Sequence, residues 1–399
     1  MRLINFLAYC AAVATPVYGQ IRNPKIRPKV VKTETPAQLL AAARNEILSI
    51  IEGMNSVGPK FVRLAFHDCV GGCDGCVDLL NLDNFGLEVP IGALDHVVAS
   101  YAKRNVTRAD IWALAAHIAA DVAQQDQPGK AEYSFDWYGR PTCETINTVC
   151  FNEKKHEVPC SATRGPHREL PSPNLDTHGV LKYFDETFGL DAEETTILMG
   201  VHSLGRVQRT NSGFLGAGWD NTPLLLDNEW YHQLVGTGAT PKEWVRGAPS
   251  WKIRKIDNTD NAFPNRFQWT GGKVKANATN PVTFALNTDM AFVRDFSQHI
   301  NAAGKVNCTF KGPTACPIAN ATITFMNEYA ENNTLWLLDF RDVFTFMLEF
   351  PFPTKDACTP PKDLCFIGDL KTVATAKLAV DVSPAASPFV SPTGFVPVA

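Results

Sequence analysis

Residues 61–69 read FVRLAFHDC, and they decide how the rest of the sequence is interpreted. Arg63 and His67 lie four positions apart, so a helix places them on one face, with Phe66 beside His67. We expect this helix to run from about Gly58 to Asp68. One face then presents a base next to a permanent cation.

An imidazole beside a guanidinium suits the cleavage of a peroxide. A neutral imidazole takes a proton from one oxygen and returns it to the departing one. The guanidinium stabilises the negative charge that develops as the O–O bond breaks. Alternatively, Arg63 and Asp68 form a surface pair and His67 is an ordinary buried histidine. The continuation CVGGCDGCVDLLNLDNFGL favours the first interpretation, because Asn84 can accept the other imidazole N–H and so fix the tautomer.

His202, in ILMGVHSLGR, is a candidate metal ligand. Asp191 and Glu194 form a capping-box pattern that begins a helix, and Gly205 is a suitable stop, so His202 lies near the C-terminal end of that helix. A metal-bound histidine usually donates its second N–H to a carboxylate. The alternative is that a cationic His202 only caps the helix. The many acidic residues leave the choice of a carboxylate partner open at this point.

The composition limits the class of protein. With 399 residues, of which 45% are hydrophobic, the chain can form one large domain or two with ample core. A formal net charge of -4 gives no basic excess, so binding to nucleic acid or to an anionic membrane is not indicated. Small, roughly neutral substrates fit this balance.

Residues 1–19 have the pattern of a secretory signal peptide: one basic residue, an apolar run and small residues before Gln20. A membrane anchor would need about 20 apolar residues, more than the run from Leu3 to Ala14 provides, and we expect no later span. We therefore expect a secreted, extracellular protein. Asn-x-Ser/Thr sequons agree with a glycosylated surface, and they lie at Asn105, Asn277, Asn307, Asn320 and Asn332.

Cleavage after Gly19 removes Cys10 and leaves an even number of cysteines, which favours disulfides in an oxidising compartment. Short spacings make Cys308 with Cys316 and Cys358 with Cys365 the expected local loops, and the other pairings stay open.

Further helices are expected from Thr35, from Thr107 and over residues 335–349, because each stretch has caps or apolar residues at helical spacing. Residues 129–175 and 236–285 are rich in Gly, Pro, Asn and Cys and are predicted to be long, braced loops. Residues 351–399 are proline-rich at their end and are predicted to be a tail that lies over the domain or trails from it.

The motifs RLAFHDC, NFGL, MGVHSLG and LNTDM, in this order, resemble the plant-type haem peroxidase superfamily, which includes cytochrome c and ascorbate peroxidases and secreted fungal and plant enzymes. The resemblance covers roughly residues 35–350, within a domain of residues 20–350. It implies a mainly α fold of about ten helices in two halves with haem b between them, minor β structure and disulfide-braced loops. It also implies an enzyme that reduces hydrogen peroxide with a small reducing substrate, and we expect a monomer.

The same resemblance assigns roles to single residues. It implies Arg63, His67 and Asn84 as distal catalytic residues, Phe66 as the distal aromatic residue of secreted type, and His202 as the iron ligand. Asp289, in FALNTDMAF, is implied as the carboxylate partner of His202.

Trp219, in NSGFLGAGWDNTPLLLD, looks different, because this stretch resembles the intracellular enzymes in which a tryptophan stacks by the proximal histidine. Here the tryptophan lies one residue later. Two interpretations stay open: Trp219 holds a radical, or it only packs.

Two calcium sites follow from the resemblance. The proximal pattern is matched by oxygen ligands from Ser203, Asp220, Thr222, the Leu225 carbonyl and Asp227, and two carboxylates favour a divalent ion. The alternative is an Asx-turn at Asp220 and a helix cap at Asp227.

The distal calcium pattern is matched by Asp68, the Val70 and Gly72 carbonyls and Asp74. Cys76 replaces the expected serine, and the loop is one residue shorter than the plant form. Disulfide bracing is therefore an alternative to the ion.

Two rival functions remain at this stage. The spacing Cys69-x3-Cys73-x2-Cys76 also matches the iron–sulfur cysteines of radical S-adenosylmethionine enzymes, but a secretory signal argues against an oxygen-sensitive cluster. A non-catalytic secreted haem-binding or matrix protein on the same fold would have lost Arg63, His67 or His202, and the sequence keeps all three.

The specialised donor sites of the family are mostly missing. Asn211 lies where ascorbate peroxidases usually carry the arginine that binds ascorbate, although Arg209 is close by. Ser56 and Lys60 lie where manganese peroxidases have carboxylates, and Ile197 lies where lignin peroxidases have a surface tryptophan. Because these donor sites are missing, we expect the electron donor to be a small phenol or a similar aromatic compound.

Overall fold

The computed structural model describes residues 34–371, except 55, 145–148, 152–155, 162, 164, 166–167, 215, 217, 237–250, 257–265 and 272–282. Thr35 and the described residues after it belong to one compact unit. The predicted signal peptide, the sequon at Asn277 and the tail beyond residue 371 lie outside the described residues. Among the helices that are described, none is long and apolar enough to cross a membrane.

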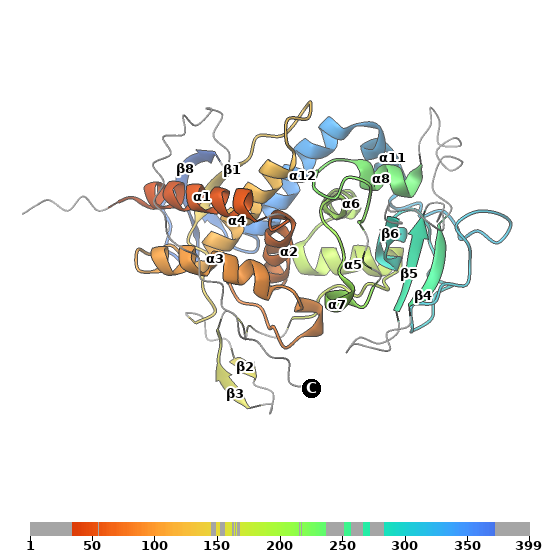
Figure 1. The fold of residues 1–399 in the computed structure, drawn as a ribbon, viewed down its shortest axis with the longest axis horizontal. Coiled ribbons are helices and arrows are strands. Elements are labelled where there is room, and N and C mark those ends of the chain that lie inside the picture. Colours follow the sequence, from red (N-terminus) through yellow and green to blue (C-terminus); the bar gives the residue numbers. More distant parts are fainter. Residues whose placement is uncertain are drawn as a thin grey trace, which may run out of the picture. The chain divides into compact units, whose positions relative to one another are not determined.

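The described residues are mainly helical, as the sequence predicts (Figure 1). The α-helices are α1 (Pro36–Gly53), α2 (Gly58–Cys69), α3 (Glu88–Ala102), α4 (Arg108–Ala123), α5 (Thr177–Phe188), α6 (Ala192–Met199), α7 (Arg209–Ser212), α8 (Glu229–Val235), α10 (Asn287–Met290), α11 (Ile323–Glu331) and α12 (Asn333–Glu349). Two 3₁₀ turns are η1 (Leu82–Asn84) and η2 (Gly200–Ser203). The strands are β1 (Ser134–Tyr138), β2 (Val149–Phe151), β3 (Glu157–Pro159), β4 (Lys252–Ile256), β5 (Arg266–Gly271), β6 (Thr283–Ala285), β7 (Thr354–Lys355) and β8 (Leu364–Lys371).

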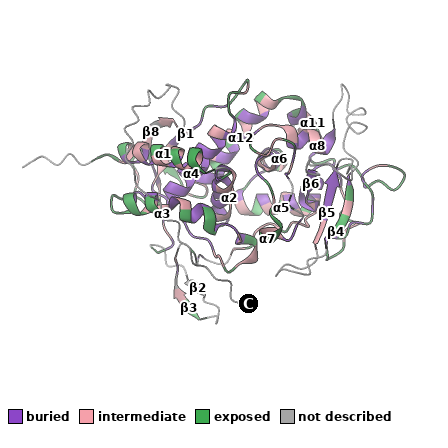
Figure 2. Ribbon diagram, in the orientation of Figure 1, coloured by how far each residue is buried: buried purple, intermediate pink, exposed green. Residues whose placement is uncertain are grey.

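Helices α1 to α4 pack against one another and form the first half of the fold. Helix α1 begins with a capping box in which the Thr35 hydroxyl accepts from the Gln38 N–H and the Gln38 side chain accepts from the Thr35 N–H. The alanine-rich α4 is buried on nearly all sides, and its small side chains let α2 approach closely, with Gly58 against Ala119. Figure 2 shows this burial in α2, α4 and α12.

The second half is built from α5, α6, α8 and α11, and α12 packs against both halves through α2 and α6. The capping box predicted at Asp191 and Glu194 begins α6 as expected. Its α-helical hydrogen bonding ends at Met199, before the predicted stop at Gly205, because the chain tightens into the 3₁₀ turn η2. His202 lies in that turn.

A buried ion pair joins three elements of the fold. The Asp110 carboxylate, in the first turn of α4, accepts from the backbone N–H groups of Gly139 and Arg140 and from the Arg140 guanidinium at 3.0 Å. Arg140 Nε in turn donates to the Leu348 carbonyl of α12. Because both charges are buried and fully engaged, removing one partner is expected to cost about 3–5 kcal/mol.

The first predicted loop, residues 129–175, contains β1 and the β2–β3 hairpin. Strand β1 pairs with β8 in an antiparallel manner, with an irregularity between Phe135 and Trp137, and β8 pairs with β7 in a parallel manner. The described part of the predicted tail, residues 351–371, thus includes two strands of this sheet.

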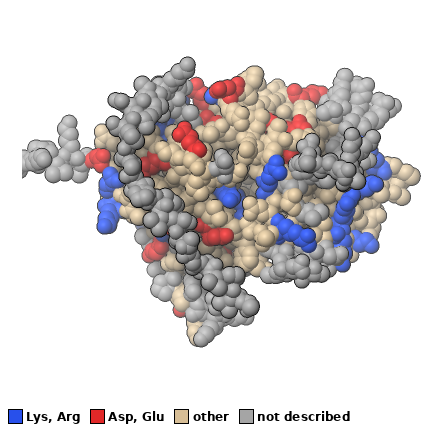
Figure 3. Space-filling view, in the orientation of Figure 1, with Lys and Arg blue, Asp and Glu red and all other residues tan. Residues whose placement is uncertain are grey.

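The second predicted loop, residues 236–285, contains the antiparallel sheet β4-β5-β6. The sequence did not indicate it, because the strands are short and their pairing joins segments separated by long connections. Strand β4 lies at an edge and exposes Lys252, Arg254 and Lys255, and Figure 3 shows Lys and Arg side chains over this part of the molecule. Charged side chains discourage an edge strand from pairing with another chain.

Five disulfides form: Cys69–Cys73, Cys76–Cys143, Cys150–Cys160, Cys308–Cys316 and Cys358–Cys365. The two short loops predicted from spacing are among them. Cys69, Cys73 and Cys76 are all oxidised, which leaves no thiolate for the iron–sulfur cluster considered above.

Gly200 provides a stability test of the turn that carries His202. A Cβ at this position would meet the Tyr231 hydroxyl and would lie 2.7 Å from Trp336 Nε1, in a closely packed core. We expect Gly200→Ala to lower the free energy of unfolding by about 1–3 kcal/mol through overpacking. Chemical denaturation measures this change.

Gly92→Ala is the matched control. Gly92 lies inside α3 and is exposed, with nothing within 4 Å of the added Cβ. This substitution should stabilise the protein by about 0.5–1 kcal/mol. Equal effects of the two substitutions would contradict the packing described around Gly200.

Candidate functional site

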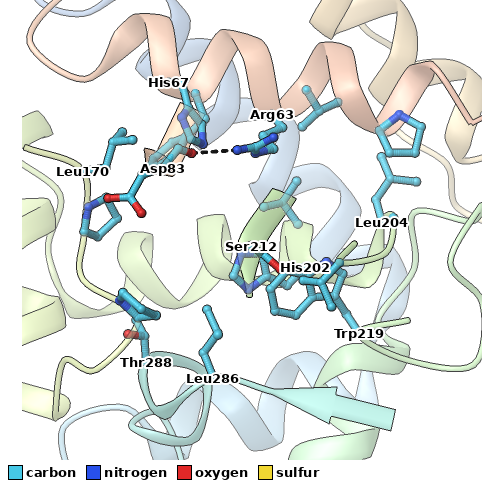
Figure 4. Close-up of a pocket in the computed structure, with 18 of the residues that line it drawn as sticks. Arg63, His67, Asp83, Leu170, His202, Leu204, Ser212, Trp219, Leu286 and Thr288 are labelled. Carbon is cyan, nitrogen blue, oxygen red and sulfur yellow. Dashed lines mark hydrogen bonds between the residues drawn. The ribbon is translucent and has the colours of Figure 1, made fainter. Parts of the chain in front are cut away.

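A cavity of about 340 Å³ lies between α2 and the segment that carries His202. Arg63, Phe66 and His67 line it from α2, and His202 and Trp219 line it from the other side (Figure 4). Residues 170–173 form part of its wall. Arg63 and His67 thus face the same cavity, as their spacing on a helix predicts.

Two backbone carbonyls fix the Arg63 side chain. Nη1 donates to the Phe85 carbonyl at 3.0 Å, and Nη2 donates to the Asp83 carbonyl at 2.7 Å. Burial lowers the pKa of Arg63 to about 10, against the opposing effect of Glu88 and Asp83. Arg63 is thus a positioned cation at neutral pH.

His67 is held as a neutral base. Its Nδ1 lies 2.7 Å from Asn84 Oδ1, and Asn84 Nδ2 donates to the Asp78 carbonyl at 2.8 Å. The second bond orients the amide with its oxygen toward the ring, so Nδ1 carries the proton and Nε2 keeps its lone pair. Burial, and then the charge of Arg63, lower the pKa of His67 to about 3. The predicted role of Asn84 agrees with this geometry.

His202 and Asp289 form the second histidine pair. His202 Nδ1 lies 2.6 Å from Asp289 Oδ1, and Asp289 Oδ2 accepts from the Leu286 N–H at 2.6 Å. Asp289 is fully buried in α10, 87 residues further along the chain. A carboxylate that accepts from one ring nitrogen makes the other a stronger metal ligand. Nε2 of His202 is the nitrogen left for a metal in the cavity.

Trp219 stacks on His202, with ring centroids 4.0 Å apart and planes 8° from parallel. The tryptophan reaches this position although it lies one residue later than in the intracellular pattern. The Phe284 ring also lies against Trp219, with ring centroids 4.9 Å apart and planes 47° from parallel. The stacking is compatible with both interpretations of Trp219, as a holder of a radical or as a packing residue.

The five residues predicted as proximal calcium ligands converge. The Ser203 hydroxyl lies 2.7 Å from Asp220 Oδ2 and 2.9 Å from Asp227 Oδ1, and 3.4 Å from the Leu225 carbonyl. The Thr222 hydroxyl lies 3.3 Å from Asp220 Oδ1 and 3.2 Å from Asp227 Oδ1. Burial raises the pKa of Asp220 to about 7, with further increases from Asp227 and Glu229. Clustered oxygens of this kind suit a hard cation.

The predicted distal calcium residues have a different environment. Asp68 and Asp74 are buried, and the guanidinium of Arg168 forms an ion pair with Asp74 at 2.5 Å and lies 4.0 Å from Asp68 Oδ1. Arg168 also donates to the Asp68 carbonyl. Sequence reasoning missed Arg168, because it lies in an irregular segment 100 residues from Asp68 with no motif around it.

Of the positions compared above with the donor sites of the family, two lie at the cavity and one is buried. Lys60 and Asn211 line the cavity, and Asn211 Nδ2 donates to Gln208. Ile197 is buried rather than exposed. Arg266, which sequence reasoning also missed, lines the cavity beside Asp83 and lies over Phe214.

The cavity fits a haem group by its donor set. One imidazole, paired with a buried carboxylate, would hold the iron, and the opposite one is held by an amide and suits acid–base chemistry. A family profile described as "Peroxidase" matches residues 43–300. The chain belongs to the plant-type haem peroxidase superfamily.

Named relatives of this peroxidase come from both fungi and plants. The chain is 23% identical over 317 residues to the mitochondrial cytochrome c peroxidase of Aspergillus fumigatus, covering 75% of this chain and 66% of the relative. It is 27% identical over 232 residues to cytosolic L-ascorbate peroxidase 2 of Oryza sativa subsp. japonica, covering 54% and 78%. A Yarrowia lipolytica protein whose name gives it as a predicted heme-binding peroxidase is 28% identical over 198 residues, covering 45% and 57%.

The matched region of this chain thus spans little more than half of the length of the Yarrowia relative. Two of these relatives are named as a mitochondrial and a cytosolic protein. Phe66 lies on the distal side, where its ring contacts His67 edge-on.

The charge of Arg63 gives a test of the distal site. Arg63→Leu removes the cation that lowers the pKa of His67, so that pKa should rise by about one unit. Below the pKa the ring is protonated and cannot act as a base, so the acid limit of His67 moves to higher pH. Histidine-selective NMR on the protein without haem, recorded as a function of pH, measures the shift.

Arg341→Leu is the control. Arg341 pairs with Asp342 on α12, and the pKa of His67 is set by burial, Arg63 and Asn84 rather than by Arg341. The same movement of the His67 signal in both variants would mean that the distal pair is not coupled as described.

Proposed function

We propose that this protein binds haem b in the cavity, with His202 as the iron ligand, and that it reduces hydrogen peroxide. The observation that carries the proposal is the arrangement of two imidazoles on opposite sides of one cavity, each held by a different partner. Asp289 favours a strong ligand on one side. Asn84 and Arg63 favour a neutral base next to a cation on the other.

The chain's own residues account for the proton transfers. Haem, when bound, supplies iron that binds the peroxide and accepts its oxidising equivalents. His67 Nε2 would take the proton from one oxygen of the peroxide and deliver it to the other, which would leave as water. Arg63, fixed by two carbonyls, stabilises the negative charge on the departing oxygen without having to move first. Asn84 keeps the proton on Nδ1 throughout.

The electron donor that we propose is a small phenol or a similar aromatic compound. The residues that would hold ascorbate or manganese in relatives are replaced, and Ile197 is buried where a surface tryptophan would be needed. Pro59, Phe66 and Phe214 give the cavity an apolar lining that suits an aromatic donor.

We also propose that the protein is secreted. Five disulfides among the described residues are typical of proteins that fold in an oxidising compartment. The sequons at Asn105, Asn307, Asn320 and Asn332 lie on exposed residues, which suits glycosylation.

A calcium ion at the proximal oxygen cluster is part of the proposal. Ser203 follows His202 directly, so an ion held by Ser203, Asp220, Thr222, the Leu225 carbonyl and Asp227 would fix the turn that carries the iron ligand. Two carboxylates at one buried point favour a divalent cation over a monovalent one.

A non-catalytic haem-binding protein on this fold is the alternative. The peroxide step separates the two. The purified protein should show a haem absorption band that shifts on addition of hydrogen peroxide and returns when a phenolic donor is supplied. An unchanged band in intact haem-loaded protein would favour the alternative.

His67→Leu tests the role of the base. The variant should keep its haem, because His202 is unchanged, and should react with peroxide about 10²–10⁴ times more slowly. Stopped-flow absorbance measures the rate. His96→Leu, which changes an exposed histidine of α3, is the control and should react at the rate of the unmodified protein. A normal rate in His67→Leu would exclude His67 as the base.

Removal of calcium tests the proximal site. A calcium chelator should lower the free energy of unfolding. The expected decrease is about 2.7 kcal/mol relative to protein in free calcium at 100 times the Kd of the site. Asp227→Asn should abolish this response, and Asp126→Asn, at an exposed carboxylate, should not. Calorimetry with and without chelator measures the effect. A response that persists in Asp227→Asn would place the ion elsewhere.

A further inference from the structure

The guanidinium of Arg168 lies at the C-terminal end of α2. Asp68 follows His67 directly, and Asp68 and Asp74 are both almost completely buried. The guanidinium of Arg168 reaches both residues: Nη2 lies 2.5 Å from Asp74 Oδ2, and Nη1 lies 4.0 Å from Asp68 Oδ1 and donates to the Asp68 carbonyl. The Arg168 side chain is itself 12% exposed.

We propose that the Arg168 guanidinium takes the place that the sequence resemblance gives to a distal calcium ion, and that the protein binds no calcium between Asp68 and Asp74. The inference concerns cation binding and is independent of whether the protein turns over peroxide.

The positions of the oxygens support the replacement. A calcium ion needs six to eight oxygens at about 2.3–2.6 Å. Here the Asp68 carbonyl and Asp74 Oδ2 already accept from Arg168, and Asp68 Oδ1 and Asp74 Oδ1 accept from the Cys76 N–H at 2.9 and 3.2 Å. An ion that used the first two oxygens would have to share their space with the guanidinium, and the two positive charges would repel each other.

A second observation concerns the ligand that is missing. Cys76 stands where the calcium pattern has a serine, and its sulfur is bonded to Cys143. It therefore offers no oxygen. Disulfide bracing and the guanidinium act together here, since the disulfide holds the loop and Arg168 pairs closely with Asp74.

The loop is also shaped around the arginine stem. Gly71 has φ of +82°, and a Cβ there would lie 3.5 Å from Arg168 Nε and 3.6 Å from Arg168 Cδ. The stem thus lies against the glycine backbone. This contact would be lost if a metal ion and water molecules took the place of the side chain.

Arg168 links two parts of the cavity. It precedes residues 170–173, which line the cavity wall, and it binds the end of α2 immediately after His67. A fixed arginine makes this link independent of the calcium concentration. A bound ion would make it sensitive to calcium removal.

Counting bound calcium tests the proposal. Arg168→Ala in the full, haem-loaded protein exposes the two carboxylates to each other and opens the space between them. We expect this variant to bind one more equivalent of calcium than the unmodified protein in equilibrium dialysis, and to gain more thermal stability from added calcium. The additional equivalent should disappear in Arg168→Ala/Asp74→Asn. The comparison is a difference, so it holds whether or not the proximal site is filled.

Arg341→Ala is the matched control, because it removes a guanidinium next to Asp342 and should bind calcium as the unmodified protein does. Asp74→Asn alone provides the test if Arg168→Ala does not fold. It should leave the number of bound calcium ions unchanged, because no ion uses Asp74 while Arg168 is present. Loss of a calcium ion in Asp74→Asn, or no additional ion in folded Arg168→Ala, would overturn the proposal.

Discussion

The hydrogen bond between His202 and Asp289 is the interaction on which the site depends. It joins residues 87 positions apart, and it is made by a carboxylate with no exposure to water. A charge in such a place persists only when its oxygens are engaged. One oxygen accepts from the imidazole and the other from the Leu286 N–H. The position of the imidazole therefore follows from the position of a short helix, α10.

Helix α10 is in turn fixed by its neighbours. The Asn287 side chain accepts from Trp269 Nε1 of β5 at 2.9 Å and donates to the Gly304 carbonyl at 2.8 Å. The sheet β4-β5-β6 thus helps to support His202, the proposed iron ligand. Trp219 completes this side by stacking on the ring of His202.

The distal side of the cavity is organised more locally. Its two functional side chains belong to one helix, so their spacing is set locally, and their electrostatics are set by burial and by Asn84 and two carbonyls. The acidic side chains near the two histidines also have different surroundings. On the proximal side the oxygens of Ser203, Asp220 and Asp227 converge, and on the distal side the guanidinium of Arg168 lies next to two buried acids.

The sequence by itself determined the features that depend on neighbours along the chain. These are the helix that puts Arg63 and His67 on one face, the helix caps at Thr35 and Asp191, and the disulfide loops Cys308–Cys316 and Cys358–Cys365. Helical periodicity and side-chain capping act over a few residues, so their pattern is visible in the sequence. The resemblance of four motifs added His202, Asp289 and the proximal oxygen residues, which local patterns could not select.

Only the tertiary structure decided the rest. It paired β1 with β8 and built the sheet that supports α10, because strand pairing across long connections leaves no local signal. It placed Trp219 on His202 despite the shift of one residue, and it brought Arg168 to Asp68 and Asp74 across 100 residues. Burial makes such distant charges depend on one another, and burial is a property of the folded chain rather than of any stretch within it.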